Sequence, residues 1–340
     1  MCERVQYIPL PFAQRAQLVA TGIMTKALYG CAATPPSKAT QQKLRSAAGK
    51  AVWGQGNRWR CNEILFTSLC QGHRIDAIQA TAYATFMVAR RVLGKQQELW
   101  PMYCDVFELR MQEMRRSSRV STIGGPVLAL LQAASAAGGM FENPGLVSYR
   151  APNNTQQRFL LLEGETKKMA HEVREGLRAE QYVLLEDRRP SFEGIAYNGL
   201  DRKSTEVILS DKITGFQKYM LRCIMAGAMA SCSRLHKAKI LDSPRCCCCG
   251  AQMETFMHIV DDCPALAHTR FREFSPSEWA QLPSCTRSHG LVPICLDPAS
   301  IPPRYQGEPK ALAADVQYTL IDMFLHRASL MGRPAPQPRW

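Results

Sequence analysis

The sequence predicts a mainly α-helical protein made of two helical regions, and two observations support this prediction. Apolar residues recur every three or four positions through most of the chain, which places them on one face of an α-helix. Glycines and prolines punctuate these stretches, and no alternation of apolar and polar residues typical of a strand persists for long. We therefore expect helices joined by short turns, with a bundle-like arrangement at the N-terminus.

Three apolar stripes predict the first helices, and each of them ends at a glycine. The stripes and their terminal glycines are 12–27 with Gly30, 44–52 with Gly54, and 75–93 with Gly94. Glycine commonly ends a helix because it adopts the left-handed conformation without steric cost. Further helical periods cover 97–117, 126–137, 156–186, 212–230 and 309–331.

Two stretches rich in turn-forming residues divide the chain. Residues 138–155 are rich in glycine, proline and asparagine, which predicts a linker between a basic domain over 1–137 and a helical region over 156–281. Prolines become frequent again towards the C-terminus. We expect there, in order, an irregular connection over 282–308, an amphipathic helix over 309–331 and a flexible tail over 332–340.

The net charge of +13 is distributed unevenly along the chain. Residues 1–150 hold 18 Lys and Arg against 8 Asp and Glu, whereas residues 151–340 hold 24 against 21. A basic surface favours phosphate backbones because binding releases their counterions. Charge alone leaves open the alternative of a merely soluble basic protein.

Cysteine usage and hydropathy indicate the compartment. The chain has 14 cysteines, no apolar run of 18 residues and no N-terminal layout typical of a secretory signal. We therefore expect an intracellular protein of the nucleus or cytoplasm. In such a reducing compartment cysteines bind metal more often than they form disulfides.

A run of cysteines followed by a histidine and a further cysteine is the most informative pattern. Read as Cys246-x2-Cys249-x8-His258-x4-Cys263, it supplies three thiolates and one imidazole within 18 residues. Zinc prefers this ligand set in tetrahedral geometry, and a Cys-x2-Cys pair chelates from one tight turn. Gly250 follows the pair, where its backbone permits a bend. We predict a zinc knuckle over 246–263.

The pattern leaves two alternatives open. Either Cys247 or Cys248 could replace a neighbour as ligand, although the spacing to Gly250 favours Cys246 and Cys249. The second alternative is a buried cysteine-rich turn without metal, whose thiols pack as small apolar groups. Five other histidines have no partner at ligand spacing, and we expect them to be exposed or internally hydrogen-bonded: His73, His171, His268, His289 and His326.

A resemblance to a known family rests on the following segments: Leu221–Gly227, Arg234-Leu235-His236, Cys246-x2-Cys249-Gly250, Glu254-Thr255, His258 and Cys263-Pro264. Together they resemble the zinc-binding region of LINE-type (non-LTR) retrotransposon reverse transcriptases, which lies C-terminal to the polymerase. Near the N-terminus, Leu10-Pro11-Phe12, Arg15, Lys26–Gly30, Leu44-Arg45 and Val52-Trp53-Gly54 resemble the thumb-like helices after the polymerase palm. The resemblance covers about 1–95 and 215–275.

The catalytic palm of that family has no counterpart in this sequence. Polymerisation requires carboxylates that hold two metal ions on an aromatic-x-Asp-Asp turn. The single Asp-Asp pair, Asp261-Asp262, lacks the aromatic residue and lies between two predicted metal ligands. A pattern Asp-x10-Glu-x-Lys at 297–310 loosely resembles a nuclease core, but a proline within it would interrupt the strand. We therefore expect no enzymatic activity from the isolated chain.

The expected partner is RNA or DNA, bound without strong sequence preference. Basic residues flank the predicted knuckle and would contact phosphates: Arg234, Lys237, Lys239, Arg245, Arg270 and Arg272. The resemblance also implies other parts of a retrotransposon ribonucleoprotein as partners, and Met1 would then begin inside a longer ancestral protein. Two alternatives remain open: a zinc-stapled module for protein–protein interaction, and a pseudogene fragment without selected function.

Overall fold

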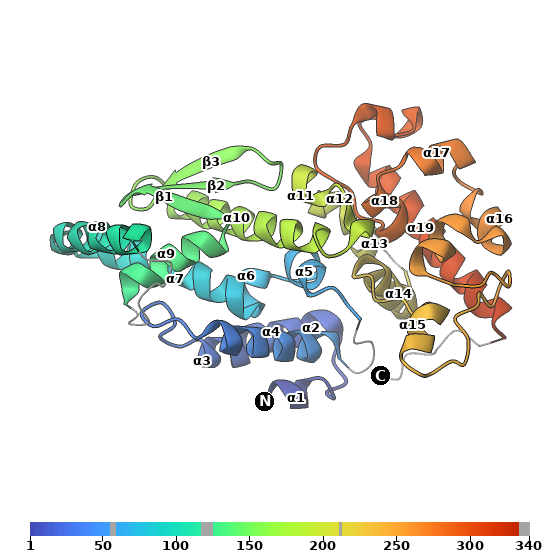
Figure 1. The fold of residues 1–340 in the computed structure, drawn as a ribbon, viewed down its shortest axis with the longest axis horizontal. Coiled ribbons are helices and arrows are strands. Elements are labelled where there is room, and N and C mark those ends of the chain that lie inside the picture. Colours follow the sequence, from blue (N-terminus) through green and yellow to red (C-terminus); the bar gives the residue numbers. More distant parts are fainter. Residues whose placement is uncertain (55–58, 117–124, 211–212, 333–340) are drawn as a thin grey trace. The chain divides into compact units, whose positions relative to one another are not determined.

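The computed structural model describes residues 1–54, 59–116, 125–210 and 213–332, and the predicted mainly α-helical class is confirmed (Figure 1). The chain forms two compact units. Unit 1 comprises Met1–Gly56 and Leu65–Leu184, and unit 2 comprises Asn57–Ile64 and Leu185–Trp340. Their boundary therefore falls near the end of a helix, not at the predicted linker. Residues 333–340 of the predicted flexible tail lie outside the described residues.

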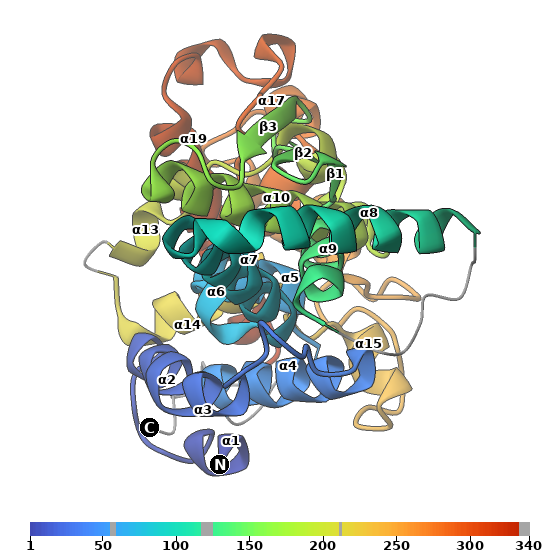
Figure 2. The same cartoon turned by 90° about the vertical axis from the view of Figure 1, so that its left-hand side faces the viewer.

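The helices of unit 1 follow most of the predicted stripes, although the helix predicted over 156–186 begins only at Thr166 and the one predicted to end at Gly94 extends to Lys95. They are α1 Cys2–Val5, α2 Phe12–Leu18, η1 Val19–Met24, α3 Thr25–Ala27, α4 Lys38–Trp53, η2 Leu65–Leu69, α6 Gly72–Ile75, α7 Ala77–Lys95, η3 Gln97–Leu99, α8 Trp100–Arg116, α9 Pro126–Ala136 and α10 Thr166–Glu186. Gly30 and Gly54 both have a positive φ, as a helix-ending glycine requires. Figure 2 shows α8 crossing in front of α7 and α9, which contact each other in the core.

The predicted linker over 138–155 is instead part of an antiparallel sheet. Its strands are β1 Gly139–Asn143, β2 Leu146–Arg150 and β3 Gln156–Leu160, in the order β1-β2-β3. Phe141 and Phe159 are both paired with Val147 in the sheet, and all three side chains are buried. Most of the turn residues that suggested a linker lie in the connections between these short strands.

The sheet covers α10 in unit 1, and one glycine permits the close approach. A Cβ atom on Gly176 of α10 would lie 2.9 Å from the Tyr149 ring and 2.8 Å from the Ala137 carbonyl oxygen. Tyr149 also donates a hydrogen bond to Glu172 on the same helix. On the far side of this core, Phe86 of α7 meets Phe141 and Phe159 with ring centroids 6.4 and 5.6 Å apart.

Unit 2 consists of short helices gathered around one long helix. The elements are α5 Asn62–Ile64, η4 Pro190–Phe192, α11 Ile195–Asn198, α12 Arg202–Thr205, α13 Val207–Ser210, α14 Gly215–Met225, α15 Cys232–Lys237, η5 His258–Asp262, η6 Pro264–Leu266, α16 Ala267–Arg270, α17 Pro276–Gln281, α18 Ser284–His289, η7 Pro298–Ser300, η8 Pro303–Tyr305 and α19 Pro309–Leu330. None of the described helices is long and apolar enough to cross a membrane.

Helix α19 was predicted at nearly the observed bounds, but its environment differs from that of an amphipathic surface helix. It contacts α12, α13, α14, α16 and α18, and buried residues occur on several of its faces. The preceding segment, predicted as an irregular connection over 282–308, includes α18. Four of the six residues of α18 are buried, so part of this connection belongs to the core of unit 2.

His289, the last residue of α18, lies in the middle of an aromatic stack. Its ring is parallel to Phe192 at a centroid distance of 3.9 Å and to Phe256 at 4.9 Å. Nδ1 lies 2.8 Å from the Ile224 carbonyl oxygen, and Nε2 lies 3.0 Å from the Ser191 hydroxyl. The carbonyl requires a donor at Nδ1. Because full burial favours the neutral ring, Nε2 carries no proton and accepts from the hydroxyl. The prediction of an internally hydrogen-bonded histidine is confirmed here.

The first testable prediction concerns acid stability. Burial lowers the pKa of His289 to about 3 from the ordinary 6.5. Between these two pH values the unfolded imidazole takes up a proton that the folded one rejects, so stability falls as pH falls. Over that range the loss approaches about 1.4 kcal/mol per pH unit. The measurement is the free energy of unfolding of unit 2 in urea, monitored by hydrogen exchange at several pH values between 7 and 4.5.

His289→Leu provides the comparison. We expect the variant to be less stable at pH 7 because it loses two buried hydrogen bonds, and to have a shallower decline towards pH 4.5. Other titrating groups contribute to both proteins, so the difference between the two curves isolates His289. Parallel curves would show that this histidine does not titrate as the stack implies.

Candidate metal centre

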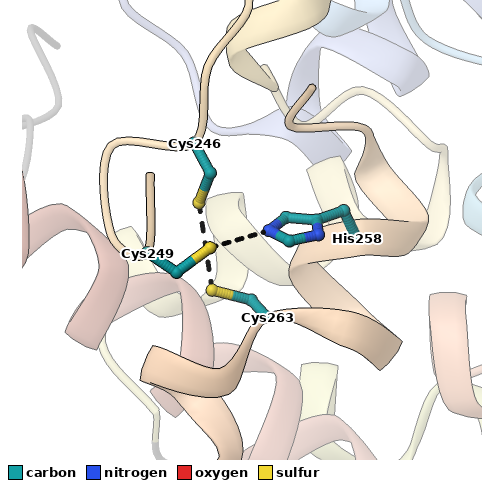
Figure 3. A group of neighbouring side chains, drawn as sticks. All are labelled: Cys246, Cys249, His258 and Cys263. Carbon is teal, nitrogen blue, oxygen red and sulfur yellow. Dashed lines mark hydrogen bonds between the residues drawn. The ribbon is translucent and has the colours of Figure 1, made fainter. Parts of the chain in front are cut away.

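The four predicted ligands converge on one point in unit 2. One ligand atom from each of Cys246, Cys249, His258 and Cys263 lies within 4.8 Å of the other three (Figure 3). The sulfurs of Cys246 and Cys263 are 3.9 Å apart, and Cys249 Sγ lies 3.3 Å from His258 Nε2. Two sulfurs bound tetrahedrally to an ion at about 2.3 Å lie about 3.8 Å from each other. The cluster therefore has the spacing of a closed four-coordinate metal site.

A short hairpin positions the first two ligands. The Cys246 N–H donates to the Ala251 carbonyl at 2.8 Å, and the Gly250 N–H donates to the Cys246 carbonyl at 2.9 Å. Gly250 has a φ of 77°, in the left-handed region, so the bend expected from the sequence is present. The Glu254 N–H donates to the Pro244 carbonyl at 2.8 Å and closes the base of the hairpin. Both thiols consequently point to the same side.

A single helical turn, η5, positions the other two ligands. His258 begins the turn, and its N–H donates to the Thr255 hydroxyl at 3.0 Å. The Cys263 N–H donates to the His258 carbonyl at 2.7 Å, which brings the two ends of the turn together. This bond explains why a spacing of four intervening residues suffices to place an imidazole beside a thiol.

Longer-range contacts hold η5 in place. The guanidinium of Arg270, which is 3% exposed, donates to the carbonyls of Ile259 and Cys263, both at 3.3 Å. Asp261 accepts a hydrogen bond from Trp279 Nε1 at 3.1 Å and forms an ion pair with Arg287 at 3.3 Å. The Asp261 carboxylate thus joins the turn to α17 and α18.

Glu254 connects the hairpin to two other elements of unit 2. Its carboxylate is fully buried, pairs with Arg327 of α19 and accepts the Cys232 N–H at the start of α15 at 2.8 Å. Burial alone would raise its pKa, but the hydrogen bonds and charge of Arg327, with the Cys232 amide, outweigh burial and hold the pKa at about 2. Glu254 belongs to the motif that carries the family resemblance. Nothing in the sequence indicates that Arg327 and Cys232 are its partners.

The six cations predicted to bind phosphates divide into two groups. Three are exposed near the hairpin: Lys237, Lys239 and Arg245. The other three have internal partners. Arg270 binds the carbonyls described above, Arg234 donates to the carbonyls of Gly227 and Met229, and Arg272 pairs with Asp322 and Glu273. Because Arg270 is buried, its expected role as a surface phosphate ligand does not fit its position.

The backbone at Lys239 is also unusual. Its φ of 58° lies in the left-handed region, directly after the C-terminus of α15. The Lys239 N–H donates to the His236 carbonyl, and the Ile240 N–H donates to the Leu235 carbonyl. This pair of bonds is the pattern of a Schellman motif. Glycine adopts this conformation with less strain than lysine.

Comparison with known proteins gives no match among protein-family models, curated proteins or solved structures, so the site is described from its geometry alone. The cluster has three sulfurs and one nitrogen, so it could hold one metal ion. Burial raises the pKa of the Cys263 thiol to about 12, and metal binding must therefore displace its proton.

The second prediction concerns the ligand set. Protein purified under reducing conditions should contain one metal ion per chain, and Cys249→Ser or His258→Ala should abolish it. Cys247→Ser is the matched control, because it removes a neighbouring exposed thiol and leaves the four ligands intact. Native mass spectrometry counts the ions. Loss of metal from the control, with retention in Cys249→Ser, would mean that a different pair of cysteines chelates.

The third prediction concerns the buried ion pair. Glu254→Gln leaves the Arg327 guanidinium buried without a counter-charge, which should cost about 3–5 kcal/mol in the free energy of unfolding. The double variant Glu254→Gln/Arg327→Met removes both charges and should recover much of this loss. Chemical denaturation of metal-loaded protein measures both variants. Equal destabilisation by the single and double variants would argue against a stabilising role of the pair.

Proposed function

We propose that this protein is a zinc-stabilised nucleic-acid-binding protein without catalytic activity of its own, related to the C-terminal part of non-LTR retrotransposon reverse transcriptases. The observation that carries the proposal is the convergence of Cys246, Cys249, His258 and Cys263 directly after an exposed basic segment. The resemblance of the ligand pattern to the zinc-binding region of that family supports the same proposal.

Zinc fits the cluster better than other common ions. Three thiolates and an imidazole are soft or borderline donors, and carboxylate-preferring ions such as magnesium and calcium do not select them. All four tetrahedral positions are filled by side chains, so the ion has no open position for a substrate. Its role is therefore to hold the hairpin and η5 together.

The basic segment that precedes the hairpin is the proposed contact surface. Lys237, Lys239 and Arg245 are exposed, and so is the apolar side chain of Ile240, at 64%. The left-handed backbone of Lys239, which glycine would adopt more easily, is the kind of local strain that clusters at functional sites. Cations bind phosphates irrespective of sequence, and exposed apolar groups contact bases. This combination favours sequence-tolerant binding of single strands.

Unit 1 supports the proposal independently. No acidic residue occurs between Glu3 and Glu63, a stretch that includes the whole of α2, η1, α3 and α4. Its lysines are exposed: Lys26, Lys38, Lys43 and Lys50. Tyr29 beside them is 93% exposed. A surface on which lysines outnumber carboxylates attracts polyanions over a long range at low salt.

The absence of catalysis is part of the proposal. Asp261 is occupied by Trp279 and Arg287 and lies on a helical turn, an arrangement unsuited to holding a catalytic metal pair. Glu308 and Lys310 of the nuclease-like pattern lie at the start of α19 and not on a strand. Both observations favour a binding role.

The fourth prediction tests the contact surface. Lys237→Gln/Lys239→Gln/Arg245→Gln should weaken binding of single-stranded RNA or DNA of any sequence. Each lost phosphate contact reduces the slope of log K against log salt by about 0.7, so the triple variant should flatten it by about 2. Fluorescence anisotropy at several salt concentrations measures this. Lys203→Gln/Lys218→Gln/Lys310→Gln, which removes equal charge elsewhere in unit 2, should change the slope much less.

Removing zinc provides the second arm of this test. A chelator should disorder the hairpin and weaken binding, because the cations lose their fixed positions. If the triple variant and the zinc-free protein both bind like the parent, the hairpin is not the nucleic-acid site. A zinc-stapled module for protein–protein interaction would then explain the geometry better, since Arg234, Arg270 and Arg272 already bind partners within the protein.

A further inference from the structure

Three cysteines beyond the four ligands also lie at the centre. Cys247 Sγ is 3.7 Å from Cys248 Sγ and 3.4 Å from a carboxylate oxygen of Glu254. Ligand atoms of Cys232, Cys247 and Glu254 lie within 4.8 Å of one another, as do those of Cys246, Cys248 and Glu254. Six cysteines therefore form a continuous group of sulfurs, although the zinc site uses only three of them.

We propose that Cys232, Cys247 and Cys248 form a second site, made of thiolates alone, which binds one soft monovalent ion, Cu(I), beside the zinc centre. This site is separate from the zinc ligands and does not depend on nucleic-acid binding. Cys247 is its central member, because its sulfur is close to both of the others.

The sulfur spacing fits a two- or three-coordinate ion. Two sulfurs at about 2.3 Å from one ion lie about 4.0 Å apart in a trigonal arrangement and about 4.6 Å apart in a linear one. The separation of 3.7 Å between Cys247 and Cys248 is near the first value. The sulfurs of Cys232 and Cys247 are at most 4.8 Å apart, which is compatible with either the trigonal or the linear arrangement. Both separations from the Cys247 sulfur are therefore compatible with a shared ion.

The contacts of Glu254 decide against a second zinc ion. Its carboxylate already receives two hydrogen bonds from Arg327 and one from the Cys232 amide. It is therefore not free to serve as a fourth ligand, and zinc prefers four. Three sulfurs without an oxygen donor match the preference of Cu(I) for soft ligands.

Charge and access are compatible with an ion at this position. Arg327 Nη2 lies 3.9 Å from Cys232 Sγ, where its positive charge favours the thiolate. Cu(I) would displace one proton from each thiol that it binds, and these protons pass to the buffer. Cys247 is exposed and gives the ion a path from solvent, whereas Cys232 is only 2% exposed and shields its inner side.

The experiment uses the full chain loaded with zinc, under anaerobic conditions. Cu(I) is added in competition with a chromophoric Cu(I) chelator, and native mass spectrometry counts both metals. We expect one Cu(I) to bind with the zinc ion retained. In Cys247→Ser/Cys248→Ser this Cu(I) should be lost while zinc stays, and the retained zinc shows that the variant is folded.

Two further variants make the result specific. Cys232→Ala should also lose the Cu(I), since it removes the buried sulfur but keeps the backbone amide that binds Glu254. Cys2→Ser/Cys295→Ser removes two accessible thiols elsewhere and should bind Cu(I) like the parent. Displacement of zinc by Cu(I) in the parent, or unchanged Cu(I) binding by Cys247→Ser/Cys248→Ser, would overturn the proposal. Zinc retained without any Cu(I) would overturn it and leave the zinc site intact.

Discussion

The buried ion pair between Glu254 and Arg327 is the interaction on which the arrangement around the metal centre depends. Removing both charges from water is costly, and the pair is tolerable only because the Cys232 amide completes the hydrogen bonding of the carboxylate. Through these bonds one carboxylate joins the hairpin, the start of α15 and the end of α19. The base of the hairpin is thus attached to the core of unit 2 through Glu254.

The candidate metal centre combines local and distant determinants. Its four ligands lie within a short segment, so chelation needs only the hairpin and η5. The orientation of η5 depends instead on Arg270 and on Asp261 with its partners Trp279 and Arg287. A zinc ion there would connect two pieces of chain that the core of unit 2 already holds near each other, which suits a structural ion.

The division of the cations has a chemical basis. Arginine has five donors in a planar fork and readily binds several carbonyls, as Arg234 and Arg270 do. Lysine is a compact, strongly hydrated charge and stays at the surface, as Lys237 and Lys239 do. A count of basic residues near the knuckle therefore overestimates the charge available to a ligand, and the lysines are the better guide.

Local chemistry in the sequence determined most helices and the convergence of the four predicted metal ligands. Helical periodicity, the glycines after α3 and α4, and the spacing of Cys246, Cys249, His258 and Cys263 each depend on residues close together in the chain. Sequence could therefore predict the mainly α class, most helix positions and the four converging side chains.

Only the tertiary structure decided the remaining features. The strands over 139–160 are five residues each and are stabilised by packing on α7 and α10. Strands this short leave little alternating pattern in the sequence, so the glycines and prolines between them suggested a linker. Burial of α19, the pairing of Glu254 with Arg327 and the approach of Cys232 to Cys247 all join residues far apart in the chain. Such contacts leave no periodic pattern in the sequence, because the partner that satisfies each group is chosen by the packing of the whole unit.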